Sequence, residues 1–199
     1  YKIHQFIPQT GNVYLTIGDQ ASRQITVEEK LYCKELSHGD VKIMYYPVVF
    51  SRLSGHEFYV IKIIGSTIMP RNFDGYATGD GDSDVNDGYI ILPHHGETVD
   101  DYMLDITSDD IPSDWYTTNK KDVRKLKKTY EARIPQKIYV TQSGAYCPTE
   151  PLDGMGYMEA VFVPSPLMYD PTARAIYKGK QSEYSKLSRI GGEGRSTAT

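Results

Sequence analysis

The chain has 199 residues, enough for one hydrophobic core, and its 39% hydrophobic and 24% charged residues exclude a wholly disordered protein. The formal net charge of −4 lacks the excess of basic residues typical of nucleic-acid binding, so we reserve such a contact for the C-terminal third. The apolar runs are far shorter than the roughly 20 residues of a bilayer span, and we expect no membrane span.

The first sixty residues predict consecutive antiparallel hairpins. Runs rich in Val, Ile, Tyr and Thr are separated by turn residues such as Gly, Asn and Asp. The excess of 17 Tyr over 5 Phe also favours strands and partly solvent-exposed surfaces over a fully buried helical core. The predicted strands are residues 3–7, 13–17, 24–33, 41–50 and 58–64.

Residues 69–88 form a predicted long loop in which oxygen-bearing side chains recur at alternate positions. Such spacing can wrap a hard cation, but the Gly and the closing acid do not fall where an EF-hand requires them. A calcium site of another kind is therefore one interpretation, and a solvated acidic loop facing a basic partner is the other. The calcium ligands would be Asp80, Asp82, Asp84, Asn86 and Asp87.

Two further strands are predicted at 89–92 and 100–107, followed by a basic amphipathic helix. Asn119 is a suitable N-cap, and Pro135 ends the helical pattern. Between them, apolar residues recur at spacings of three, four and four, as on one face of a helix. These residues are Val123, Leu126, Tyr130 and Ile134.

Charge is strongly segregated in the middle of the chain. Residues 63–119 carry twelve acidic side chains against the single basic residue Arg71, a net −11, whereas residues 120–137 have a net +6. Opposed fields of this kind orient a partner, and we expect other copies of the chain or other assembly subunits to bind here. The predicted partner-binding residues are Lys120, Lys121, Arg124, Lys125, Lys127, Lys128, Ile190 and Arg195.

The C-terminal part changes character after Pro164. Strands are predicted at 137–142 and 157–163, and residues 1–164 are expected to form a single β-rich domain. Residues 165–199 are polar and rich in Pro, Gly, Ser and Thr, which predicts an extended tail with little to bury. A neighbouring chain would give such a tail its order.

Catalytic signatures are weak. His94 and His95 follow a predicted strand as metal ligands can, but the other histidines are scattered along the chain. A Gly-x-Ser-x-Gly motif is absent, and no lysine between Lys62 and Lys120 could activate Ser66. Cys33 and Cys147 are interpreted as two buried thiols. We therefore expect no enzyme.

The sequence as a whole predicts a mainly β protein, an antiparallel sandwich or jelly-roll-like domain with one basic amphipathic helix and long inserted loops. Its expected role is that of a structural subunit of a larger assembly, with a capsid, head or tail component of a virion as the leading example, without a cofactor. The first alternative is a calcium-dependent binding module, for example for glycans. The second is a metal-assisted hydrolase centred on His94 and His95.

Overall fold

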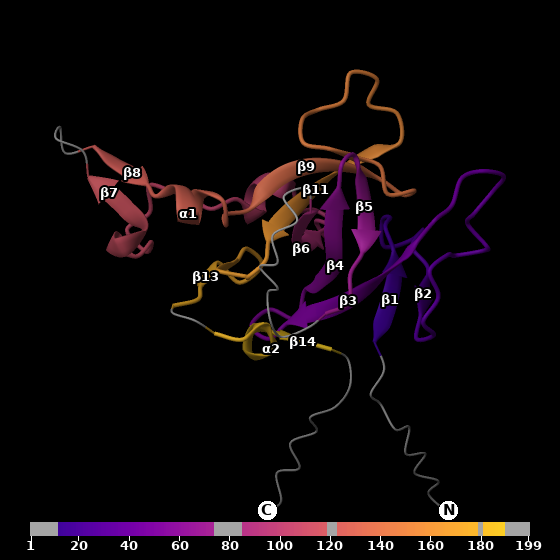
Figure 1. Ribbon diagram of the computed structural model, residues 1–199, viewed down its shortest axis with the longest axis horizontal. Coiled ribbons are helices and arrows are strands. Elements are labelled where there is room, and N and C mark those ends of the chain that lie inside the picture. Colours follow the sequence, from indigo (N-terminus) through magenta and orange to yellow (C-terminus); the bar gives the residue numbers. More distant parts are fainter. Residues whose placement is uncertain (1–11, 74–84, 119–122, 179–180, 190–199) are drawn as a thin grey trace, which may run out of the picture.

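The computed structural model describes residues 12–73, 85–118, 123–178 and 181–189, and a ten-stranded antiparallel sheet dominates it (Figure 1). The prediction of a mainly β, antiparallel protein is confirmed. The central strand order is β10-β9-β11-β6-β4-β3-β1-β2, with β5 added to β4 and β14 added to β3. In chain order these strands are β1 (Val13–Thr16), β2 (Ile25–Thr26), β3 (Tyr45–Ser51), β4 (Glu57–Ile64), β5 (Thr67–Pro70), β6 (Val85–Ile91), β9 (Gln136–Thr141), β10 (Tyr146–Cys147), β11 (Tyr157–Pro164) and β14 (Leu187–Ser188).

Both faces of the sheet are buried, which explains the nearly continuous apolar run of β4. Side chains alternate between faces along a strand. Tyr59 and Ile61 join one hydrophobic cluster, whereas Phe58 and Val60 join a second cluster on the opposite face. Each fully buried side chain of this size contributes about 1.5–3 kcal/mol of hydrophobic free energy. Packing on both faces gives the domain its sandwich-like character.

The sheet curls around the first cluster because β5 also contacts the turn between β9 and β10. The backbone amide of Ile68 donates to the carbonyl of Gly144 at 2.8 Å, and that of Tyr146 donates to Ser66 at 2.8 Å. Gly144 has a φ of 90°, in the left-handed region that favours glycine. A Cβ at this position would lie 2.8 Å from the Tyr46 hydroxyl. This close approach joins two distant parts of the same sheet.

A module of residues 104–118 and 123–134 projects from the sheet (Figure 1). Its elements are η2 (Ser113–Trp115), β7 (Tyr116–Thr118), β8 (Arg124–Leu126) and α1 (Lys128–Glu131). The β7–β8 hairpin packs Trp115 against Leu126, and the Trp115 ring stacks on Tyr130 with centroids 4.7 Å apart. The module therefore has a small core of its own, which Met168 and Ile176 extend.

The predicted long basic helix is wrong for the residues that are described. Residues 124–126 are a strand, and only the single turn of α1 is helical. Lys127 has the extended dihedral angles φ −65° and ψ 141°, which separate the strand from that turn. Val123, expected on the buried face, is 56% exposed. Pairing with β7 outweighs the helical spacing of the apolar residues.

Two predicted strands are also wrong or much shorter than expected. Residues 99–102 form the 3-10 helix η1 (Val99–Tyr102) instead of starting a strand at 100–107. Thr98 and Asp101 form a capping box there, in which the Thr98 amide donates to the Asp101 carboxylate at 2.8 Å. Of predicted strand 24–33, only β2 is formed. The predicted strand 3–7 lies outside the described residues.

The extended tail predicted from residue 165 onwards is wrong for residues 165–178 and 181–189. They form β12 (Tyr169–Asp170), β13 (Ala175–Ile176), α2 (Glu183–Lys186) and β14. Leu167 and Leu187 are fully buried in the second cluster. The segment packs because Leu167 and Leu187 reach the sheet and its buried side chains Glu183 and Lys186 bond each other. Residues 190–199, including Ile190 and Arg195, lie outside the described residues.

In the part of the chain that the structure describes, no helix is long and apolar enough to cross a bilayer.

Candidate functional site

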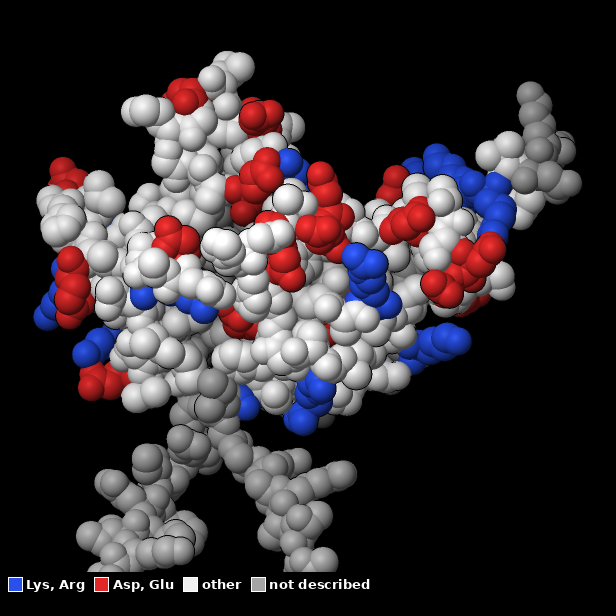
Figure 2. Space-filling view, turned by 180° about the vertical axis from the view of Figure 1, so that it is seen from behind, with Lys and Arg blue, Asp and Glu red and all other residues white. Residues whose placement is uncertain are grey.

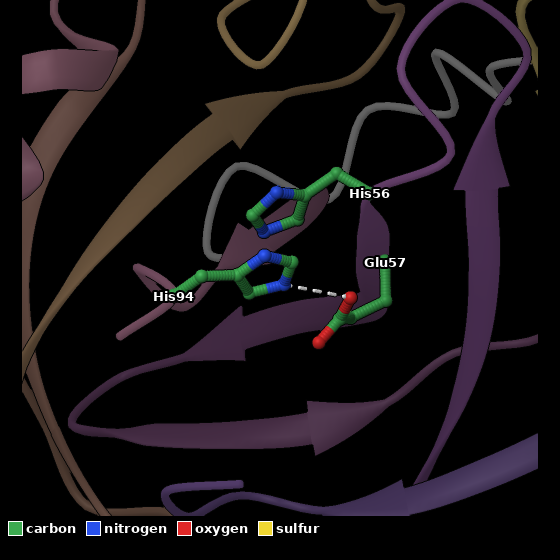
Figure 3. A group of neighbouring side chains, drawn as sticks. All are labelled: His56, Glu57 and His94. Carbon is green, nitrogen blue, oxygen red and sulfur yellow. Dashed lines mark hydrogen bonds and ion pairs between the residues drawn. The ribbon is translucent and has the colours of Figure 1, made fainter. Parts of the chain in front are cut away.

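Strand pairing brings together three side chains that we call the His–Glu cluster, namely His56, Glu57 and His94 (Figure 3). In the antiparallel pair β4–β6, Tyr59 lies opposite Ile90. Continuing this register places the start of β4 beside the end of β6, where the chain leaves the sheet at Pro93. Residues almost forty positions apart in the sequence therefore meet at one corner of the sheet.

A tight turn fixes the backbone of His94. The amide of Glu97 donates to the His94 carbonyl at 3.0 Å, and the His94 amide donates to the Glu97 carboxylate at 3.0 Å. Gly96 has a φ of 88°, which this turn tolerates because glycine has no Cβ. The Tyr102 hydroxyl also donates to the Glu97 carboxylate. The turn is thus tied to η1 and holds the imidazole of His94 over β4.

Glu57 lies between two partners. Its Oε1 accepts from the Arg23 guanidinium at 2.6 Å, and its Oε2 lies 3.0 Å from Nε2 of His94. Burial alone would raise the pKa of Glu57, but the hydrogen bonds from Arg23 and His94 outweigh it and lower the pKa to about 2. Glu57 is therefore an anion at neutral pH.

His56 is buried, as Glu57 is. Its ring stacks on that of His94 with centroids 3.8 Å apart and an interplanar angle of 8° (Figure 3). Its Nε2 lies 3.3 Å from the carbonyl oxygen of Leu92, which can only accept, so this nitrogen carries the proton in that contact. Burial and the neighbouring His94 lower the pKa of His56. The ring is neutral at neutral pH and keeps one nitrogen lone pair.

An open cavity of about 1200 Å³ borders the cluster. Glu57 and His94 lie in its wall together with Arg23, and His95 and Glu97 lie at the same end. The remaining wall is partly apolar, with Val41, Ile43, Leu92 and Met158 among its residues. Two imidazoles, an ionised carboxylate and an adjoining cavity are suited to holding a cation or accepting a proton.

Of the five predicted calcium ligands, the structure describes only Asn86 and Asp87. Asp80, Asp82 and Asp84 lie outside the described residues. Asn86 and Asp87 are consecutive residues of β6, so their side chains point to opposite faces of the sheet. The Asp87 carboxylate lies 4.0 Å from Nε of Arg71. The structure therefore does not bring these two side chains to one ion.

The predicted partner-binding cations that are described lie on the projecting module. Arg124 stacks over the Tyr116 ring at 4.5 Å and lies 3.9 Å from Asp109, while Lys127 donates to the carbonyl of Asp114 at 2.6 Å. Lys125 and Lys128 are exposed. Figure 2 shows basic and acidic side chains next to one another on the visible face of this module. Lys120 and Lys121 lie outside the described residues.

The sequence indicated His94 as a candidate metal ligand together with His95, but the structure places His94 beside other residues. His95 is exposed and lies beside the cavity, whereas His94 is bonded to Glu57 and stacked on His56. No sequence spacing marks His56 and Glu57 as partners of His94. Only the register between the strands at 57–64 and 85–91 could have indicated them.

Comparison with known proteins gives no relative for this chain. No protein-family model, no curated protein and no solved structure matches it.

Proposed function

We propose that this chain is a structural subunit of a larger assembly rather than an enzyme, with a capsid, head or tail component of a virion as the leading example. The observation that carries the proposal is an apolar arm, residues 25–41, on which large side chains face solvent. Exposed fractions reach 67% for Ile25 and 72% for Val27. The other exposed apolar residues of the arm are Leu31, Tyr32 and Val41.

The arm is held in place by the sheet. The amide of Tyr45 donates to the Leu31 carbonyl at 2.9 Å, and the amide of Cys33 donates to the Ile43 carbonyl at 2.8 Å. On its inner side, Cys33 packs in a small cluster with Tyr14 and Ile43. Because the backbone is already ordered, little entropy is lost when a partner covers the outer side chains.

The position of the arm also favours a protein partner. β2 is the last strand in the sheet order, and an edge strand offers free backbone groups to another chain. Apolar side chains gathered at such an edge are typical of interfaces, whereas single exposed ones are common everywhere. We propose other copies of this chain, or other assembly subunits, as the partner that covers the arm.

The charges of the projecting module support the same proposal. Lys125 and Lys128 are exposed, and acidic side chains lie beside basic ones on the visible face of the module (Figure 2). A surface with both signs fixes the register of an approaching subunit more than its affinity, and its effect weakens with salt. Apolar contact at the arm would stabilise the assembly, and the charged module would orient the subunits within it.

The test is the native mass of the purified protein, measured by light scattering over a range of concentrations. We expect oligomers in the wild type and their loss in the triple variant Ile25→Ser, Val27→Thr and Leu31→Gln, with unchanged circular dichroism because all three side chains are exposed. Leu53→Ser is the matched control, since Leu53 is 59% exposed at the other end of β3. A wild type that stays monomeric at all concentrations, or a triple variant that assembles normally, would refute the proposal.

A further inference from the structure

The His–Glu cluster carries an inference that is independent of assembly. We propose that His56, Glu57 and His94 bind one divalent transition-metal ion of the zinc class. Each residue offers one ligand atom, and these three atoms lie within 4.8 Å of one another. Two imidazole nitrogens and one carboxylate oxygen form a mixed set that suits zinc, cobalt, nickel or copper better than calcium or magnesium, which prefer oxygen ligands.

The spacing of the ligand atoms is close to that of a coordinated pair. Nε2 of His94 and Oε2 of Glu57 lie 3.0 Å apart. Two ligand atoms at about 2.0–2.2 Å from a tetrahedral ion lie roughly 3.3 Å from each other. An ion can therefore take the place of the proton that Nε2 of His94 donates to Glu57, with that proton released to solvent and only a small separation of the two groups.

Partners that fix metal ligands are already present around the cluster. The Arg23 guanidinium binds the other oxygen of Glu57 at 2.6 Å, and the Leu92 carbonyl lies 3.3 Å from one nitrogen of His56. In metal sites, such outer contacts orient the carboxylate and select which imidazole nitrogen is free to bind.

The stacked rings must open for both imidazoles to bind the same ion. A metal ion lies near the plane of an imidazole that ligates it, but the two rings here are parallel within 8° with centroids 3.8 Å apart. His94 is the ring able to turn, because its side chain is 36% exposed and borders the cavity. The cavity also leaves room for water to complete the coordination. Metal binding would thus unstack the two rings.

The experiment uses the untagged full chain after treatment with EDTA. Calorimetric titration with zinc chloride should give one ion per chain, whereas magnesium and calcium chlorides at the same concentrations should give no ion bound at this cluster. His56→Ala and His94→Ala should each weaken zinc binding at least about tenfold. Cobalt binding should give a visible absorption band in the wild type that both variants lose.

Two control variants separate this site from adventitious binding. His38→Ala removes an exposed histidine that is not part of the cluster, and His95→Ala removes the exposed neighbour of His94, so both should keep wild-type affinity. Equal binding by His94→Ala and the wild type would overturn the proposal, as would an equal loss in His95→Ala and His94→Ala. Because His56 is buried, His94→Ala keeps the test decisive if His56→Ala fails to fold.

Discussion

The buried ion pair between Glu183 and Lys186 gives the sharpest prediction about stability. The side chains of these residues are only 2% and 4% exposed, and their charged atoms lie 2.9 Å apart. Glu183 also accepts from the Tyr89 hydroxyl at 2.6 Å and from the Leu167 amide at 3.1 Å. Lys186 donates in addition to the Leu167 carbonyl at 2.7 Å. The pair thereby ties α2 to β6 and to the segment before β12.

Lys186→Met keeps most of the apolar stem but removes the charge that balances Glu183. An unbalanced buried carboxylate costs about 3–5 kcal/mol, a large fraction of the roughly 5–15 kcal/mol that stabilises a typical domain. Adding Glu183→Gln removes that charge as well, so the double variant should lose less stability than the sum of the two single variants. Coupling between the two positions should reach about 2 kcal/mol.

Urea unfolding at neutral pH, followed by circular dichroism, measures these free energies of unfolding. Lys30→Met is the control, because Lys30 lies 2.5 Å from Glu28 but both side chains are more than half exposed. We expect no change in its unfolding midpoint, since water screens exposed pairs. A loss below about 1 kcal/mol in Lys186→Met, or strictly additive single variants, would contradict the reasoning that burial makes this pair important.

The remaining predictions concern the contact of Gly144 that closes the sheet and the loss of stability at acidic pH. In urea unfolding, Gly144→Ala should lower the free energy of unfolding by about 2 kcal/mol more than Gly154→Ala. Both positions have a positive φ, but only a Cβ at position 144 would meet Tyr46 and the Ile68 carbonyl. Equal losses in the two variants would refute the crowding at Gly144. The folded-state pKa of Glu57, about 2, lies below its ordinary value, so its stabilisation is present above about pH 4.5 and is lost as pH falls toward 2. Metal-free Glu57→Gln should therefore be less stable than the wild type near neutral pH and approach it in acid; a difference in melting temperature that does not depend on pH would speak against this.

Local sequence patterns predicted the secondary structure correctly where the tertiary contacts of a segment favour the same structure as its intrinsic propensity. The apolar, β-branched runs at 13–17, 58–64 and 157–163 are strands in the structure within one or two residues. The apolar spacing around Leu126 failed because a hairpin with β7 buries that residue without a helix. Leu187 gave no recognisable signal, since a single apolar residue in a polar segment has no periodicity.

The mainly β, antiparallel character of this chain and the separation of its charges can be predicted from the sequence, because strand propensity and charge are properties of neighbouring residues. The packing of residues 165–178 and 181–189 into the domain and the meeting of His94 with His56 and Glu57 are visible only in the folded chain. Both results depend on strand register, which pairs residues far apart in the sequence. Register is fixed by the packing of the whole sheet rather than by any local pattern.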